Sequence, residues 1–425
     1  MVGAALAQAL RSNPWTSELR LVLLDRQGQP EAGRSWQGPP ELRVSTVTPA
    51  SVALLQQAQV WTDLQPPRSA GFNRMQVWDW AGSGYIQYSA SEVGLQHMGY
   101  VVENSMIQGA LLKQLLQPGN TAKLMFKESV SQMTLPPYSQ SGLNGQSGNA
   151  LASLQLESGR QVRARLVVGA DGAQSHMRSL ACLRTSGWAY GQHGVVATVR
   201  TDVPHSTAWQ RFLPRGPLAL LPVRDGLSSV VWTTSPRHAR ELTSASPLAF
   251  ALAVNQALSG GATPARNPLL AGVRGPGQGS ERPFHAPPQV VESVGPSPRS
   301  FPLHLRHAGR YVRPRFALVG DAAHAVHPLA GQGVNLGFGD VGALVSTLAH
   351  AVEAGRDIGE LTLLEEMYER PRQRANVSMM AALDALKRVF VPQTGLLATA
   401  RGLGLDALNA FPLAKNRVMM YAMGE

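Results

Sequence analysis

The densest set of residues that could do chemistry lies in Arg315–Asp340, RFALVGDAAHAVHPLAGQGVNLGFGD. Its apolar start predicts a strand ending at Asp321, where a carboxylate can accept hydrogen bonds from sugar or ribityl hydroxyls. A helix is expected to begin near Gln332, and its positive end favours a negatively charged ligand. Gly331 and Gly333 have no side chain, so backbone N–H groups there can reach the edge of a flat ring. Together these features indicate a flavin site, whereas an ordinary glycine loop would explain only one or two of them.

A second pattern, GADGAQSHMR at 169–178, places an Asp-Gly pair directly after a predicted strand. Asp171 and Gly172 are typical of a tight turn. Ser175 can cap the helix that follows, and Arg178 is expected within reach of a phosphate or a carboxylate. Asp-Gly turns are common, so this pattern is informative only in combination with the first one.

The first 25 residues predict the second half of a βαβ nucleotide-binding unit. MVGAALAQALRSN predicts a helix that Pro14 ends, and Leu19–Leu24 predicts a buried strand closed by Asp25. A complete unit has a strand and a G-x-G-x-x-G turn before the helix, and only Gly3 stands where the last glycine belongs. The sequence therefore predicts a nucleotide-binding fold whose first strand is missing, with FAD binding weakened as a result.

Composition limits the classes of function. The 425 residues are 44% apolar and 15% charged, which describes a globular protein with more than one domain. The sequence contains no run of about 18 apolar residues, and the single Cys182 cannot form an intrachain disulfide or a cysteine-built zinc site. The net charge of +11 favours an anionic membrane surface, an acidic protein or a polyanionic ligand, although a generally basic protein explains it equally. We predict no nucleic-acid partner, and we expect His324 and His327 to be structural or cavity-lining rather than metal ligands.

The expected elements divide the chain into three parts. Nucleotide-binding patterns mark one discontinuous α/β domain, aromatic-rich alternating runs mark an inserted mixed β-sheet for the substrate, and the remainder is predicted to be helical. The Gly-, Pro- and Ser-rich stretch 259–300 is predicted to be a long loop of the sheet part. The predicted ranges are 1–60, 98–190 and 301–355 for the α/β domain, 61–97 and 191–300 for the sheet, and 356–425 for the helical region.

The run GDAAHxxxPxxGQGxNxGxxD resembles the FAD-contacting signature of the class A flavoprotein hydroxylases, the family that contains para-hydroxybenzoate hydroxylase. The pattern around Asp171 resembles the Asp-Gly motif that this family places near the FAD pyrophosphate. The resemblance implies a para-hydroxybenzoate hydroxylase-like α/β fold: a Rossmann-like FAD-binding domain, an inserted mixed β-sheet and a helical C-terminal region. It implies that Pro328 and Gly331 border the catalytic pocket, with no general base assigned. The cofactor-binding residues that it implies are Gly3, Asp25, Arg43, Asp171, Gly172, Gly320, Asp321, Gly331, Gln332, Gly333 and Asn335.

Longer stretches resemble a narrower group, the eukaryotic hydroxylases of ubiquinone biosynthesis that act at ring position 5. They are RMQVWD with MGYVVEN, AWQRFLPRGPLALLP with SSVVWTTS, and the long run that ends at Asp340. This resemblance implies a monooxygenase that hydroxylates the ring of a 3-polyprenyl-4-hydroxybenzoate through a flavin hydroperoxide. Two alternatives stay open: an FAD oxidoreductase acting on another prenylated substrate, and a non-catalytic chain with a scaffolding role in the same complex.

The same resemblance implies partners and a location. A ferredoxin and a ferredoxin reductase would be the electron source, and other ubiquinone-biosynthesis proteins would be partners. The polyprenylated substrate implies peripheral contact with the mitochondrial inner membrane, on its matrix side. MMAALDALKRVF at 379–390 and LAKNRVMMYAMG at 413–424 mix basic and apolar residues, which suits either an interfacial helix or core packing.

Several other residues also carry two interpretations. Arg43 matches the family's phosphate-contacting arginine or is a solvated side chain beside a helix. Glu103 loosely matches a position that faces the cofactor in relatives. Five apolar residues could line a tunnel for a polyprenyl tail or form ordinary core, namely Trp209, Phe212, Leu218, Leu220 and Trp232.

Overall fold

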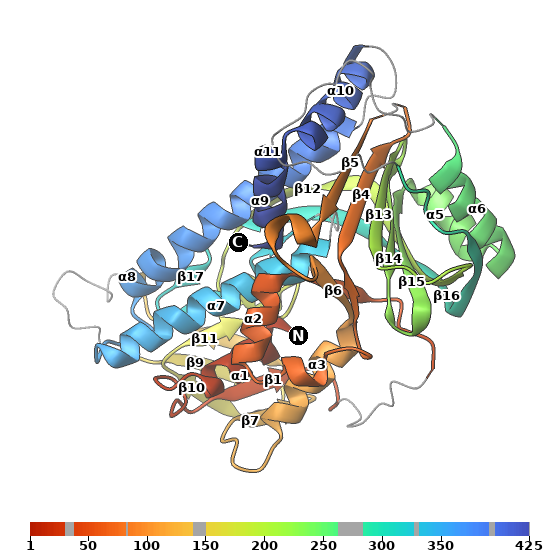
Figure 1. The fold of residues 1–425 in the computed structure, drawn as a ribbon. Coiled ribbons are helices and arrows are strands. Elements are labelled where there is room, and N and C mark those ends of the chain that lie inside the picture. The colour runs from red at the N-terminus through yellow and green to blue at the C-terminus, as the bar shows by residue number, and fades with distance from the viewer. Residues whose placement is uncertain are drawn as a thin grey trace.

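A computed structural model describes residues 1–29, 38–81, 84–138, 150–261, 284–326, 331–390 and 396–424. Two β-regions lie side by side, and a group of C-terminal helices packs across both of them (Figure 1). We call the first the parallel region, because its sheets contain parallel pairs. The second is an eight-stranded sheet, which we call the large sheet.

The parallel region combines segments from distant parts of the chain. Its main elements are α1 (Val2–Ser12), β1 (Val22–Asp25), β7 (Lys123–Phe126), β11 (Val167–Gly169), β17 (Val312–Arg313) and β18 (Phe316–Leu318). β1 pairs with β7 and β11 pairs with β18, both in parallel, while β17 extends the second pair. No strand pairing joins these two sheets among the described residues. The predicted opening helix is confirmed, and so is a strand ending at Asp25. The strand is not buried as expected, because Val22 is exposed and its other residues are half-buried.

Smaller elements surround this region. They are β2 (Val44–Val47), α2 (Pro49–Gln57), η1 (Trp61–Asp63), β3 (Ala70–Phe72), η2 (Ala90–Val93), β6 (Gly99–Glu103), α3 (Asn104–Leu115), β8 (Val130–Thr134), β9 (Ala152–Leu156), β10 (Gln161–Ala164), α4 (His176–Leu180) and η6 (Gly320–Ala322). β6 is the middle strand between β2 and β3, and β9 lies between β8 and β10. Pro49 opens α2, which suits a residue whose backbone angle is already helical and which needs no N–H partner.

The large sheet has the strand order β19-β16-β12-β15-β14-β13-β4-β5. Its strands are β4 (Arg74–Asp79), β5 (Tyr85–Ser89), β12 (Thr185–Thr201), β13 (Thr207–Leu213), β14 (Gly216–Pro222), β15 (Leu227–Thr234), β16 (Val290–Ala308) and β19 (His324–Ala325), and η4 (Arg224–Gly226) joins β14 to β15. α5 (Pro236–Ser244) and α6 (Pro247–Ser259) cover one face of it (Figure 1). Each begins with a serine whose hydroxyl accepts a backbone N–H, followed by proline, which is a strong helix start.

One expectation about this sheet is wrong. The stretch 259–300 was expected to be a loop, but residues 290–300 belong to β16, which pairs with β12. The prolines fit because the pairing shifts register between Val196 and Thr198, where Gly295 adopts a φ of +73°. The rest of the predicted loop lies mostly in 262–283, outside the described residues.

The five apolar residues considered for a tunnel are distributed over both faces of the large sheet. Trp209, Leu218, Leu220 and Trp232 pack in one buried cluster with residues of α5 and α6. This is ordinary core, because the two helices cover that face. Phe212 lies on the other face and stacks on Phe390, with the ring centroids 3.7 Å apart. The tunnel interpretation is therefore wrong for the four residues beneath α5 and α6.

The C-terminal part is helical, as predicted. Its elements are α7 (Gln332–Glu353), α8 (Leu361–Leu363), the π-helical turn η8 (Leu364–Glu369), α9 (Arg370–Phe390), α10 (Leu396–Ala410) and α11 (Pro412–Met423). α7 packs along α1 and α2, whereas α9 and α10 extend towards the large sheet (Figure 1). Within the described ranges, no helix combines the length and the apolar character needed to cross a bilayer.

Candidate functional site

Three segments distant in sequence meet at the start of α1. A side chain on Gly3 would come within 3.1 Å of the Ala170 Cβ, just before the Asp-Gly turn. Gly320 has a φ of +61°, and a Cβ there would lie 3.1 Å from the Val2 side chain. A Cβ on Gly337 of α7 would lie 2.9 Å from the Val2 side chain. Small residues therefore let the first turn of α1 approach both sequence motifs.

The start of α7 is open in the way a ring-binding backbone requires. Gly331 precedes the helix with a φ of +65°, and no side chain caps the helix there. A Cβ on Gly331 would lie 3.0 Å from the Thr46 side chain, so glycine is required by both space and backbone angle. Among the described residues, a Cβ on Gly333 would meet no atom closer than 4.0 Å. Gln332 is buried, and its Nε2 donates to the Ala422 carbonyl at 3.0 Å.

Asn335 fixes the position of this turn. Its Oδ1 accepts a hydrogen bond from the Thr48 backbone N–H at 3.1 Å and one from the Ser51 hydroxyl at 2.8 Å. Its Nδ2 donates to the Thr46 carbonyl at 2.8 Å and also contacts the Gly331 carbonyl. The side chain is thus a positioning group between α7 and the β2–α2 turn. Direct cofactor contact by Asn335 stays a prediction.

Acidic groups lie near the start of α1. Asp321 and Asp25 both lie close enough to act electrostatically on the first residue of that helix. Asp321 is solvent-exposed, yet desolvation by the surrounding protein raises the pKa of its carboxyl, against the opposing charges of His324 and Arg43. Asp25 uses one oxygen to accept the Gln27 N–H at 2.8 Å, which leaves the other oxygen for a ligand hydroxyl.

The Asp-Gly motif is a tight turn that caps α4, as predicted. Gly172 has a φ of +86°, and Asp171 accepts the backbone N–H groups of His176 and Met177 at 2.7 and 3.0 Å. Ser175 caps the helix by accepting the Arg178 N–H. Arg178 is buried and lies close enough to the Asp171 carboxylate to interact with it electrostatically, whereas its contact with a phosphate stays a prediction.

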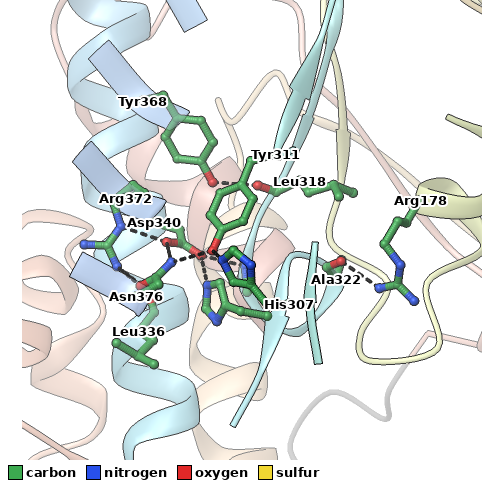
Figure 2. A network of polar contacts seen from close by, with 12 residues as sticks. Arg178, His307, Tyr311, Leu318, Ala322, Leu336, Asp340, Tyr368, Arg372 and Asn376 are labelled. Carbon is green, nitrogen blue, oxygen red and sulfur yellow. Dashed lines mark hydrogen bonds and ion pairs between the residues drawn. The ribbon is translucent and has the colours of Figure 1, made fainter. Parts of the chain in front are cut away.

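Arg178 connects the two motifs. Its Nη1 donates to the Ala322 carbonyl at 2.7 Å, and its Nη2 donates to the Ala173 carbonyl at 3.1 Å (Figure 2). Arg306 also donates to the Ala173 carbonyl, at 2.6 Å. Two cations therefore hold the Asp-Gly turn against the turn that carries Asp321.

A buried polar network centred on Asp340 holds the Gly320 turn (Figure 2). Asp340 accepts the Gly320 N–H at 2.9 Å, and its Oδ2 lies 2.5 Å from His324 Nε2. Its other oxygen accepts from Arg372 at 2.8 Å and from Asn376 at 3.2 Å. Burial alone would raise the pKa of Asp340, but the charges and hydrogen bonds of His324 and Arg372 outweigh burial and lower it.

The network continues towards β16 and β18. Asn376 donates to the Tyr311 hydroxyl at 3.2 Å, and that hydroxyl lies 3.0 Å from His307 Nε2. The Tyr368 hydroxyl donates to the Leu318 carbonyl at 2.5 Å. Desolvation raises the pKa values of Tyr311 and Tyr368, and desolvation together with the His324 charge lowers the pKa of His307. These groups therefore hold α9 against the strand that leads into the Gly320 turn.

Of two histidines and one proline in the Arg315–Asp340 motif, the structure describes only one histidine. His324 is buried and pairs with Asp340, which fits the structural role expected for it. His327 and Pro328 lie outside the described residues. Within the described ranges, no group of three or more His, Cys, Asp and Glu residues is placed to hold a metal ion.

Glu103 has a structural partner that its sequence pattern did not indicate. Its Oε1 accepts a hydrogen bond from Arg224 Nε at 2.6 Å, and both side chains are buried. Its Oε2 accepts the Glu41 backbone N–H at 2.7 Å. The carboxylate is therefore used to join β6 to the turn between β14 and β15.

The face of the large sheet opposite α5 and α6 is apolar, and α9, α10 and α11 pack on part of it. Ala219, Leu221 and Val231 lie in central strands and are nevertheless half-exposed, whereas Leu218, Leu220 and Val230 on the covered face are fully buried. We call this the inner face. Its next strands contribute Met75 and Tyr88, which are paired across β4 and β5 and also half-buried.

The inner face adjoins the Arg315–Asp340 motif. Val326, the last described residue before the Gly331 turn, packs in the same cluster as Met75 and Tyr88. The Tyr88 hydroxyl forms no hydrogen bond with any described residue, and desolvation raises the pKa of its phenol to about 12. Tyr88 thus has a neutral hydroxyl in apolar surroundings beside the Arg315–Asp340 motif.

Comparison with known proteins agrees with this arrangement. The chain is 39% identical over 434 residues to the ubiquinone biosynthesis monooxygenase COQ6, mitochondrial, of Xenopus tropicalis, covering 99% of this chain and 91% of that protein. The human protein of the same name is 37% identical, with 99% and 90% covered. The chain belongs to this monooxygenase family. The 3-demethoxyubiquinol 3-hydroxylase of Escherichia coli (strain K12) is 33% identical, with 100% of this chain and 96% of that protein covered.

Two further comparisons concern the cofactor and the fold. The family described as FAD binding domain matches residues 286–380, which include the Gly320 turn and α7. The p-nitrophenol 4-monooxygenase PnpA from Pseudomonas putida DLL-E4 has a TM-score of 0.71 at 18% identity, with 99% of this chain and 94% of that chain covered. PqsL from Pseudomonas aeruginosa, a probable FAD-dependent monooxygenase, has a TM-score of 0.66 at 18% identity, with 95% and 96% covered. The expected aromatic-hydroxylase fold is confirmed, and FAD is the cofactor of this monooxygenase.

The residues present fit FAD. Two helix N-termini without side-chain caps, those of α1 and α7, lie in packed helices and favour the negative charges of phosphate and reduced flavin. Asp25 and Asp321 have carboxylate oxygens available for ribose and ribityl hydroxyls. Gly333 leaves space above the backbone where a flat ring must approach.

Some of the site was not expected from the sequence. The pairing of His324, Arg372 and Asn376 with Asp340 was missed, because the partners are far apart in sequence and no local pattern links Arg372 to the motif. Tyr88 was also missed. The alternation in YIQYS could have placed it on one face of a strand, but not on the face that α5 and α6 leave uncovered.

Proposed function

We propose that this FAD-dependent monooxygenase hydroxylates the aromatic ring of a 3-polyprenyl-4-hydroxybenzoate in ubiquinone biosynthesis. The observation that carries the proposal is the apolar inner face beside the Arg315–Asp340 motif, whose central side chains are only half-buried. A ring with a long hydrocarbon tail needs apolar surface to bind, and the half-exposed Ala219, Leu221 and Val231 provide it. The names of the curated relatives support the same pathway.

In this proposal the cofactor residues act through backbone and carboxylate groups. Gly3, Arg43, Asp171 and Gly172 would lie around the pyrophosphate, with Asp25 on the adenosine ribose. The following residues would hold the ribityl chain and the flavin ring: Gly320, Asp321, Gly331, Gln332, Gly333 and Asn335. Reduced FAD supplies the activation of dioxygen when it is bound.

The protein's own task is to orient the substrate ring and exclude water. Pro328 and the Gly331 backbone would border the pocket on the cofactor side, and the inner face would border it on the other. The neutral Tyr88 hydroxyl is suited to donate a hydrogen bond to a polar group on the ring. No side chain in this arrangement is proposed as a general base.

The division of the chain remains a proposal of the same kind. We assign cofactor binding to 1–60, 98–190 and 301–355, and substrate binding to 61–97 and 191–300. The helical remainder 356–425 supports both, because α9 joins the Asp340 network and also packs on the large sheet.

We further propose a ferredoxin with its reductase as the electron source, other ubiquinone-biosynthesis proteins as partners, and a peripheral position on the matrix side of the mitochondrial inner membrane. The net charge of +11 supports attraction to an acidic electron carrier and to anionic lipid. The mitochondrial relatives support the compartment.

The decisive experiment supplies the purified chain with FAD, a ferredoxin, its reductase and isotopically labelled dioxygen. The expected product of a 3-polyprenyl-4-hydroxybenzoate carries one labelled oxygen on the ring, detected by mass spectrometry. The Asp321→Ala variant is the matched negative control, and Cys182→Ser, which changes an exposed thiol, is the positive one. A product altered only in the prenyl chain would refute the proposal.

A further inference from the structure

The C-terminal helix α11 connects the surface of the molecule with the cofactor motif. At its last turn, the Ala422 carbonyl accepts a hydrogen bond from Gln332 at 3.0 Å. Gly424, directly after the helix, lies so close to the first turn of α2 that a Cβ would be 3.0 Å from that of Ala50. Twelve residues give the helix a length of about 18 Å, so its other end lies well away from this site.

One face of α11 is fixed to the protein. Met419 and Met423 are buried in a cluster with Phe72 and Ala208 of the β-regions. The Lys415 ammonium is buried as well and lies 2.8 Å from the Glu92 carboxylate. This face therefore needs no further partner.

The opposite face of α11 is exposed and mainly apolar. Leu413 is 85% exposed, the largest exposed fraction among the big apolar residues of the described chain. Val418 and Tyr421 are each 47% exposed, and Phe411, which precedes the helix, is 54% exposed. We call these four residues the α11 outer face. Large apolar side chains gathered on an exposed helix face indicate contact with an apolar partner.

The charge on this helix indicates the kind of partner. Arg417 lies among the exposed residues, and the sequence of α11 contains no acidic residue. Apolar side chains with a cation and a tyrosine between them match the boundary of an anionic bilayer, where tails, headgroups and water meet. We propose that the α11 outer face docks on an anionic lipid surface and thereby brings the inner face to a lipid-tailed substrate. This inference extends the proposed function.

Vesicle binding tests the docking surface directly. The purified full chain is mixed with vesicles of phosphatidylcholine containing phosphatidylglycerol, and the bound fraction is measured by flotation. We expect Leu413→Glu to weaken binding by about tenfold or more, since docking would bury the leucine in lipid and the variant would place a charge there. The matched control is Leu248→Glu on α6, because Leu248 is also a helical leucine, 63% exposed. We expect that variant to bind like the parent chain.

Several results would overturn the docking proposal. They are no flotation of the parent chain, equal binding by Leu413→Glu, or an equal loss with Leu248→Glu. A dimer of the parent chain that Leu413→Glu converts to a monomer without lipid would show that a second copy covers this face. Arg417→Glu should bind the anionic vesicles less tightly than the parent chain at low salt, with the difference shrinking at high salt.

Activity assays separate this inference from the proposed function. Leu413→Glu should hydroxylate a short-tailed, water-soluble 4-hydroxybenzoate analogue like the parent chain, and lose about tenfold in rate on long-tailed substrate supplied in vesicles. If neither protein hydroxylates either substrate, the proposed function fails while the flotation result still decides the docking. If Leu413→Glu loses both activities equally, the residue acts on the fold and the docking proposal is refuted.

Discussion

The Gly320 turn and the inner face border the same expected pocket, but they are held by different contacts. Around Gly320, buried polar side chains from three elements meet at one carboxylate, that of Asp340. Across the large sheet, the inner face has apolar side chains that are only half-covered, while the other face is closed by α5 and α6. Polar contacts with strict geometry fix the cofactor side, whereas half-buried apolar side chains make up the side that we propose for the substrate tail. Five substitutions test this contrast.

The largest effect is expected from Asp340→Ala. It removes the acceptor for the Gly320 N–H and leaves buried His324 and half-buried Arg372 without their carboxylate, which costs about 3–5 kcal/mol of unfolding free energy. Urea unfolding measures the loss, and FAD retention should fall with it. Asp384→Ala, which removes the partner of exposed Arg388, should cost below about 1 kcal/mol.

The same network predicts a pH dependence. The folded-state pKa of Asp340 is lowered below its unfolded value, so its contribution is present above about pH 4 and is lost as the pH falls through the folded pKa. The parent chain should lose more stability than Asp340→Ala over this acidic range. Equal acid sensitivity of the two proteins would contradict the role given to the network.

Adjacent residues of β14 test the two faces of the large sheet. Leu220→Ala opens a cavity beneath α5 and α6, and we expect a loss of about 2–5 kcal/mol in stability with an unchanged KM. Ala219→Leu adds volume on the inner face, so KM for a long-tailed substrate should rise several-fold while stability changes by less than about 1.5 kcal/mol. Steady-state kinetics and urea unfolding of both variants provide the comparison. The opposite pattern would place the substrate on the covered face.

Gly331→Ala tests whether the start of α7 needs glycine. A φ of +65° costs a residue with a Cβ about 1–2 kcal/mol, and the contact with Thr46 adds to this. FAD affinity, measured by fluorescence titration, should fall at least tenfold. Gly109→Ala in α3 is the control, because a Cβ there meets no atom within 4 Å and alanine favours helix. A normal FAD affinity in Gly331→Ala would refute the proposed role.

The smallest effect is expected from Tyr88→Phe. Removing a hydroxyl without a described partner should leave stability within about 0.5 kcal/mol of the parent chain, while KM rises about three- to tenfold from the lost hydrogen bond to substrate. Since the pKa of Tyr88 is raised to about 12, the phenol stays protonated near neutral pH. The pH profiles of kcat/KM should therefore have the same shape in both proteins, and an inflection lost in the variant would contradict this.

The contrast also explains what the sequence could predict. The cofactor side consists of short sequence motifs, in which glycine, aspartate and asparagine mark turns and helix starts. For this reason α1, α7 and the Asp171 turn were predicted correctly. The sequence did not predict that Arg178 donates to the Ala322 carbonyl, because this contact depends on the packing of segments 144 residues apart. Local spacing carries no information about such a contact.

On the substrate side, alternation identified strands but not their faces. Trp209 and Phe212 lie three residues apart on β13 and therefore point to opposite sides, and only the position of α5 and α6 decides which side is covered. β16 was missed for a related reason. Its Gly and Pro residues are typical of loops, but a shift in pairing register lets the strand accommodate them.

The long pair β12 and β16 has a consequence for protein engineering. The two strands pair along most of their length, and β16 then pairs with β19, which contains His324 of the flavin motif. Backbone hydrogen bonds thus connect the large sheet to β19, which follows the turn that presents Asp321. A chimera that exchanges substrate specificity with a relative would have to transplant these strands whole, because any junction placed inside them would sever the ladder that aligns the two halves of the active site.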